Sequence, residues 1–227
     1  MTRILLIRHA HSVANERGIL AGRSPGVALT AKGEEQAKAL ADRLTDVAIS
    51  KVWISPLERC HMTIAPLLKT FSAKNRPEVY TTDDLTEVDY GSWTGKKLSS
   101  LYKQKLWKVV QDRASEMNFP EGESLAQMQV RAMRALSLAA SAAGGTQILV
   151  SHGDVLKSIV AGILKTHLDN FQRIIIDPAS ITVIEYDGAS YRLISLNNTL
   201  APISELAKSS GKGKVRALIG GGSGRNR

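Results

Sequence analysis

The sequence predicts an α/β protein built on a layered sheet, and two observations support this class. Short aliphatic runs typical of buried strands alternate with segments of helical periodicity. Two histidines, His9 and His152, each follow one of these runs directly, and open α/β sheets keep their ligands at the carboxyl ends of their parallel strands. The alternation is interrupted over residues 85–120, which we interpret as an inserted lid.

The amino-terminal half contains three predicted strands, at residues 2–7, 51–54 and 79–80. Between the first two strands lie a loop rich in turn residues and a helix that Thr30 is placed to cap. A second helix is expected to begin with Pro56 near its first position, where proline is tolerated. Pro66 is expected to kink or divide this helix, because an interior proline removes a backbone hydrogen bond.

The carboxyl-terminal half predicts one long helix and then a mixture of strands and helices. The apolar face of the long helix runs from Leu125 to Ala139, and the helix is expected to end at Gly144-Gly145. Asp187-Gly188 predicts a hairpin turn. The expected ranges are 97–102 and 106–113 for helices of the insertion, 147–150 for a strand, 154–165 and 168–173 for helical segments, and 181–186 and 191–196 for the hairpin strands.

The composition is that of a globular protein with one principal domain, expected over residues 1–200. The 227 residues are 43% hydrophobic and 22% charged, which suffices for a full core. The net charge is +9, and the chain after Glu205 contributes six positive charges and no acid within a Gly/Ser-rich stretch. Residues 201–227 are therefore expected to form a basic, disordered tail. A single cysteine, Cys60, and the absence of a signal-peptide pattern or long apolar run predict a cytoplasmic protein.

Four groups of residues could together act on a phosphate: Arg8-His9, Arg59, Glu87 and His152. Each group alone is a weak signal, but their joint placement at strand ends and in one loop is informative. Arginine neutralises phosphate oxygens with a permanent charge and a planar set of donors. A neutral imidazole can attack phosphorus and leave again, while a second, protonated imidazole can hold the equatorial oxygens. A carboxylic acid can protonate the leaving oxygen and then activate water, so the set requires no metal.

Longer segments around these groups resemble a known family. The segments, in chain order, are Arg8-His9-Ala10 with Ser12 and Asn15, Ser55-Pro56-Leu57-Glu58-Arg59-Cys60 with Thr63, residues 87–95, residues 120–124, and Ser151-His152-Gly153. Together they are similar to the histidine phosphatase superfamily, which contains the cofactor-dependent phosphoglycerate mutases, and the similarity covers roughly residues 3–197. It implies a Rossmann-like three-layer α/β/α sandwich with a mostly parallel sheet and a helical lid.

The resemblance also implies a role for each site residue. His9 would be the phosphorylated nucleophile, and Glu87 would be the proton donor. The residues expected to hold the phosphate are Arg8, Arg59 and His152, with Asn15, Ser12 and Gly153 as further contacts. The family uses no metal. The resemblance also implies that the partner is a small phosphorylated metabolite.

Three departures from the mutase pattern favour a phosphatase. Val88 stands where the mutases have arginine in the acid-bearing motif, and Asp154 stands where they have asparagine. Residues 106–113 lack the paired arginines that hold the substrate carboxylate in the mutases. A phosphoglycerate mutase remains the alternative, and it alone would need a cofactor, a bisphosphoglycerate primer.

Other classes of function stay open. The family usually has glycine where Ala10 stands, and a positive φ there would strain alanine and favour a non-catalytic phosphate-binding protein. His9 and His11 form an H-x-H pair of the kind that begins some metal-hydrolase sites, although no cluster of further ligands follows. The tail could contact nucleic acid through backbone electrostatics. The oligomeric state stays open and permits a homodimer through an exposed sheet edge.

The insertion contains residues that suit either the substrate or the fold. Trp93 and Trp107 could line a pocket or pack in the core. Its lysines suit a multiply anionic substrate or, more simply, a solvated helix face: Lys96, Lys97, Lys103, Lys105 and Lys108.

Overall fold

The chain folds around a six-stranded sheet in the order β3-β2-β4-β1-β5-β6. The computed structural model describes residues 1–142 and 145–199, so the predicted tail at 201–227 lies outside the described residues. The first four strands of this order pair in parallel, while β5 pairs antiparallel with β1 and β6 antiparallel with β5. The strands are β1 Thr2–Arg8, β2 Ile49–Ile54, β3 Glu78–Thr81, β4 Thr146–Ser151, β5 Ile181–Tyr186 and β6 Tyr191–Asn198. The mostly parallel sheet is confirmed.

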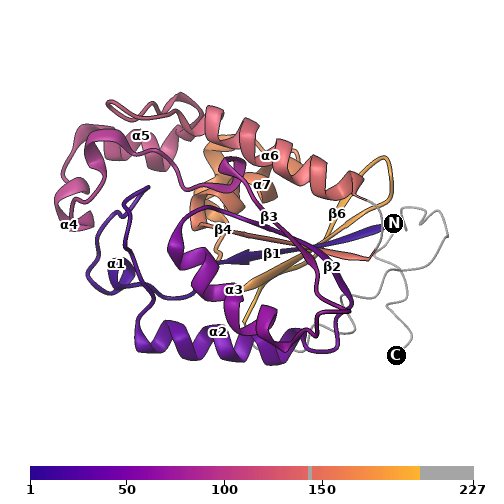
Figure 1. The fold of residues 1–227 in the computed structure, drawn as a ribbon. Coiled ribbons are helices and arrows are strands. Elements are labelled where there is room, and N and C mark those ends of the chain that lie inside the picture. Colours follow the sequence, from indigo (N-terminus) through magenta and orange to yellow (C-terminus); the bar gives the residue numbers. More distant parts are fainter. Residues whose placement is uncertain (143–144, 200–227) are drawn as a thin grey trace.

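Helices cover both faces of this sheet, as the predicted three-layer sandwich requires (Figure 1). On one face lie α2 (Ala31–Leu44) and α3 (Glu58–Thr70), and on the other lie α6 (Leu125–Ser141) and α7 (Gly153–Ile163). Among the helices of the described chain, none combines the length and the apolar character that crossing a bilayer requires.

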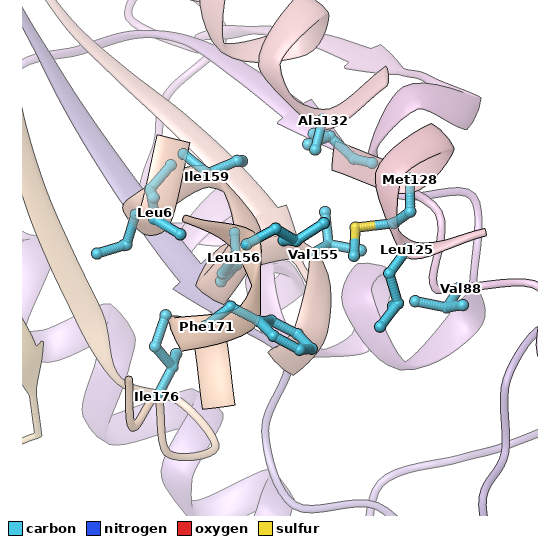
Figure 2. Close-up of a cluster of buried hydrophobic side chains, with 14 of the residues drawn as sticks. Leu6, Val88, Leu125, Met128, Ala132, Val155, Leu156, Ile159, Phe171 and Ile176 are labelled. Atoms are coloured by element: carbon cyan, nitrogen blue, oxygen red, sulfur yellow. The ribbon is translucent and has the colours of Figure 1, made fainter. Parts of the chain in front are cut away.

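The first strand takes part in both hydrophobic cores, because successive side chains of a strand point to opposite faces. Leu5 and Ile7 belong to the cluster that contains the apolar residues of α2 and α3. Leu6 belongs to the second cluster, where it lies near Leu156 and Ile159 of α7 (Figure 2). All of these side chains are fully buried. The strand is therefore held from both sides, and the residues directly after it start from a rigid support.

The insertion forms short helices and turns at the carboxyl end of β1 (Figure 1). It contains α4 (Leu98–Leu101), α5 (Lys105–Asp112) and 3₁₀ turns at Gly91–Trp93 and Ala114–Glu116. Two further 3₁₀ turns lie elsewhere: Asp83–Leu85 precedes the insertion, and Leu168–Arg173 follows α7. Val88 anchors the beginning of the insertion, since it is buried in the same cluster as Leu125 of α6 (Figure 2). A helical insertion is thus confirmed at the position the sequence indicated.

The second predicted helix starts later than expected, and it is not divided. Pro56 does not begin α3, which starts at Glu58. Pro66 lies inside α3 without dividing it. The fully buried Ile64 and Leu67 flank the proline, and their packing against the sheet holds the helix together across the missing hydrogen bond.

Two other helices also differ from expectation, α1 (Val13–Glu16) in its presence and α6 in its end. α1 begins a stretch that was expected to be a loop, and a capping box between Ser12 and Asn15 stabilises its first turn. α6 ends at Ser141, before the expected Gly144-Gly145, and Gly144 lies outside the described residues.

Candidate active site

The two histidine motifs meet because β1 and β4 are neighbours in the sheet. The register pairs Arg8 with Ser151, and the backbone amide of His9 donates a hydrogen bond to the Ser151 carbonyl over 2.9 Å. The ring centroids of His9 and His152 are consequently 5.2 Å apart. Residues separated by more than half of the chain thus share one end of the sheet.

His9 is held as a neutral imidazole in one tautomer. Its Nδ1 lies 2.8 Å from the carbonyl oxygen of Ala10, which can only accept, so Nδ1 carries the proton and Nε2 keeps its lone pair. Burial, followed by the charges of Arg59 and Arg8, lowers the pKa of His9 from 6.5 to about 3. An unprotonated ring nitrogen between two arginines is suited to attack on an anionic phosphate ester.

His152 is fully buried between Arg59 and Ser55. Arg59 donates from Nη2 to Nδ1 of His152 over 3.2 Å, so Nε2 carries the proton and donates to Ser55 Oγ over 2.8 Å. Burial and then the charge of Arg59 lower the pKa of His152 well below 6.5. The surrounding protein therefore favours neutral imidazole, whereas sequence reasoning assigned a protonated one. A phosphate dianion beside the ring would favour protonation, because an opposite charge stabilises the imidazolium.

The two arginines at the site are fixed by backbone carbonyls. Arg59 is 2% exposed and donates to the carbonyl of Gly22 over 2.8 Å. Arg8 donates from Nη1 to the carbonyl of Ile176 over 2.6 Å, but its buried Nε has no acceptor among the described residues. This Nε lies 3.4 Å from where a Cβ on Gly153 would stand, at the first residue of α7. An unsatisfied guanidinium donor beside a helix N-terminus favours an anion there.

Glu87 lies beside His152, with its Oε2 3.9 Å from His152 Nδ1. Burial, followed by the negative charge of Asp154, raises the pKa of Glu87 from 4.5 to about 7. Asp154 is held in place because its Oδ2 accepts a hydrogen bond from the Tyr90 hydroxyl over 2.9 Å. Glu87 can therefore carry a proton near neutral pH and give it up when a stronger base forms.

The loop that carries Glu87 is braced by arginines that the sequence analysis did not identify. Arg131 of α6 donates to the carbonyls of Thr86 and Glu87 over 2.5 and 3.2 Å and pairs with Glu123 over 2.5 Å. Arg23 donates to the same Glu87 carbonyl over 3.0 Å. Glu123 lies in the 120–124 segment whose resemblance was noted, but its partners could be found only in the folded chain.

Ser12 and Asn15 both line the cavity. The Ser12 hydroxyl and backbone amide donate to Asn15 Oδ1 over 2.8 and 3.0 Å. Because Oδ1 is engaged, the Asn15 amide nitrogen is the part of this side chain that can donate to an anion.

Ala10 occupies the position of the expected glycine without backbone strain, since its φ is not positive. Its buried methyl group packs in a small cluster with Leu29, Ala37 and Ala179, and it does not line the cavity. The alanine therefore neither strains the loop nor crowds a phosphate.

The H-x-H pair does not act as one unit. His11 lies outside the cavity, with its Nδ1 3.0 Å from Thr30 Oγ1. Within residues 1–142 and 145–199, no group of three or more His, Cys, Asp or Glu side chains has a metal-binding arrangement.

The cavity, of about 290 Å³, extends from Arg8, His9, Arg59 and Glu87 to a mouth lined by the insertion, whereas the buried His152 does not line it. Trp93 and Trp107 both line it and also pack on each other, with ring centroids 6.1 Å apart, so both of their suggested roles are met. The insertion lysines are all exposed, and none lines the cavity, which favours the solvated face. Lys157 of α7, which the sequence analysis passed over, lines the mouth instead.

Comparison with known proteins agrees with the fold. Residues 4–199 match the family described as the histidine phosphatase superfamily, branch 1. Phosphoserine phosphatase 1 of Hydrogenobacter thermophilus is 29% identical over 206 residues, covering 88% of this chain and 93% of the relative. A protein of Erwinia tasmaniensis named "Probable phosphoglycerate mutase GpmB" is 29% identical over 194 residues, covering 84% and 88%. The solved structure of Bacillus stearothermophilus YhfR matches with a TM-score of 0.81 at 25% identity, covering 89% of this chain and 100% of that chain.

Proposed function

The chain belongs to the histidine phosphatase superfamily and is a phosphatase or a phosphomutase, and on this premise we propose that it hydrolyses phosphate monoesters through a phosphohistidine at His9. One observation carries the proposal. His9, whose Nε2 is unprotonated, lines one cavity with Arg8 and Arg59, and its ring lies 5.2 Å from that of His152, while a carboxyl group with a pKa of about 7 stands beside His152. This set contains a nucleophile, anion-holding groups and an acid.

In the first step, His9 Nε2 attacks the phosphorus and forms the N–P bond as the ester P–O bond breaks. Glu87 gives its proton to the departing ester oxygen, so that a neutral alcohol leaves. Arg8 and Arg59 hold the phosphoryl oxygens, whose charge also favours protonation of His152.

In the second step, ionised Glu87 takes a proton from water, and the water oxygen attacks phosphorus as the N–P bond breaks. Inorganic phosphate leaves, and both Glu87 and His9 return to their starting states. No metal or organic cofactor enters either step.

The mouth of the cavity supports hydrolysis over phosphoglycerate mutation. Val88, at the position of the mutases' arginine, is buried in the core and cannot meet a substrate (Figure 2). The cation at the mouth, Lys157, lies 3.4 Å from Asp154 and 3.2 Å from Gln172 Oε1. A substrate carboxylate would thus meet one cation that already has partners. A mutase would share the first step but would return the phosphoryl group to a phosphoglycerate.

The test is phosphate release from 4-nitrophenyl phosphate with EDTA present, for wild type and His9→Ala. We expect the variant to lose about a thousandfold or more in kcat, with EDTA harmless to the wild type. The matched control is His11→Ala, two residues away and outside the cavity, which should retain activity.

Loss of wild-type activity in EDTA, or an active His9→Ala, would contradict the proposal. Interconversion of phosphoglycerates in the presence of bisphosphoglycerate, without net phosphate release, would establish the mutase instead. Phosphate binding without turnover of any ester would indicate the non-catalytic protein.

A further inference from the structure

The organic part of a substrate would meet a continuous wall of aromatic rings. From the mouth inward, the ring centroids of Tyr102 and Trp107 are 4.6 Å apart, those of Trp107 and Trp93 are 6.1 Å apart, and those of Trp93 and Phe119 are 5.5 Å apart. Phe119 then meets Tyr90 edge to face at 4.9 Å. All five side chains line the cavity, so the wall extends from solvent to the neighbourhood of Glu87.

This wall is tied to the loop across the cavity by backbone hydrogen bonds. Leu20 and Gly95 are paired, since the Gly95 amide donates to the Leu20 carbonyl over 2.8 Å. The amide of Leu98 donates to the Gly18 carbonyl over 2.8 Å. Leu20 and Leu98 themselves line the cavity. The apolar slot is therefore formed in advance, and a ligand would not have to order it.

Four polar side chains that line the cavity already contact one another. Asp154 accepts from the Tyr90 hydroxyl over 2.9 Å and lies 3.4 Å from Lys157, which also lies 3.2 Å from Gln172. A small carboxylated or zwitterionic alcohol would have to compete with these contacts. A planar apolar group would leave them intact and pack on the rings of Tyr102 and Trp107, which are more exposed than the other three.

We propose that the site selects phosphate monoesters whose alcohol carries a planar, apolar group, such as an arylalkyl group, over esters of small carboxylated alcohols. The inference rests on the proposed function, because it assigns the substrate class to the same cavity. Selectivity comes from Trp107 and Tyr102, whose ring contacts are with each other and with Trp93.

The experiment compares kcat/KM for 2-phenylethyl phosphate, ethyl phosphate, O-phosphoserine and 3-phosphoglycerate. All four are esters of primary alcohols, so the chemistry of the leaving oxygen is similar. For the wild type we expect 2-phenylethyl phosphate to exceed each of the others by about tenfold or more, the size expected of aromatic contact added to apolar burial.

Trp107→Ala should lower kcat/KM about tenfold for 2-phenylethyl phosphate and leave ethyl phosphate nearly unchanged. Trp53→Ala is the matched control, because Trp53 stacks on Tyr80 and does not line the cavity. This control should change neither substrate.

Equal kcat/KM for the ethyl and phenylethyl esters, or a preference for either carboxylated ester, would overturn the substrate class while leaving phosphohistidine hydrolysis in place. An equal loss for all four esters in Trp107→Ala would overturn the role of the ring. Failure of the wild type on all four would instead overturn the proposed function itself.

Discussion

The two ends of the cavity are built in different ways. At the inner end, Arg8 and His9 come directly from the end of β1, and Arg59 comes from the first turn of α3; His152, at the end of β4, is buried beside them. Each is fixed by a hydrogen bond to the backbone or to a buried side chain. At the mouth, the short helices of the insertion supply most of the lining together with Lys157 of α7, and Tyr102 is 55% exposed.

The difference separates the reaction from its selectivity. Strand ends held by two cores keep the charged groups within about 0.5 Å of the positions that a phosphoryl transfer requires. The insertion can change its side chains without disturbing those groups. Relatives named as a phosphatase and as a mutase match this chain over most of its length, and we expect such relatives to differ mainly at the mouth.

The largest expected effect comes from Glu87→Gln at the inner end. Without the proton donor, kcat/KM for ethyl phosphate should fall by about 10²–10⁴-fold. With 4-nitrophenyl phosphate, whose leaving group needs no proton, the first turnover should remain fast and the second step should become slow. Stopped-flow measurement should then show a burst of nitrophenolate.

The control for this variant is Glu35→Gln, on the exposed side of α2, which should behave as the wild type. Equal losses for both substrates with no burst would contradict the assignment of Glu87 as proton donor.

A smaller effect is expected from Asp154→Asn. Asp154 connects the two ends of the cavity, because it raises the pKa of Glu87 and also contacts Lys157. In the wild type, kcat/KM should be level between an acid limb set by His9, with a pKa of about 3, and an alkaline limb set by Glu87, with a pKa of about 7. Burial and then the charge of Asp154 raise the pKa of Glu87. Removing that charge makes ionisation easier, so the alkaline limb should move to lower pH.

The acid limb serves as the internal control, because Asp154 is not among the causes that set the pKa of His9. A pH–rate profile of kcat/KM for both proteins measures both limbs. An alkaline limb that stays in place, or moves to higher pH, would show that another group sets it.

The smallest effect on activity is expected from Ala10→Gly. The methyl group is buried away from the cavity, so kcat/KM should remain within about twofold of the wild type. Added backbone freedom should lower the free energy of unfolding by about 1 kcal/mol, measurable by urea denaturation. A large gain in activity would mean that the alanine disturbs the phosphate site after all.

The sequence predicted the sheet, the helical insertion and the inner end of the cavity, because these depend on local signals. An apolar run followed by Arg8-His9 or by His152 marks a strand end wherever the strand lies in the sheet. The brace from Arg131 to the Glu87 loop depends on α6 lying beside that loop, which no local pattern encodes. The position of Lys157 in the cavity lining was not predicted, for the same reason.

Prediction was weakest where tertiary packing opposed a local rule. Pro66 stays inside α3 because buried neighbours hold the helix. Burial and then the charge of Arg59 lower the pKa of His152, and Arg59 becomes a neighbour of His152 only after folding.

The most direct test of the account is to trap the phosphoenzyme. Glu87→Gln would be mixed with 4-nitrophenyl phosphate, quenched in alkali, where phosphohistidine survives, and mapped by peptide mass spectrometry. We predict one phosphoryl group per chain, on His9, that is lost in acid. Nitrophenolate release without a phosphorylated protein, or a phosphoryl group on any other residue, would contradict nucleophilic catalysis by His9.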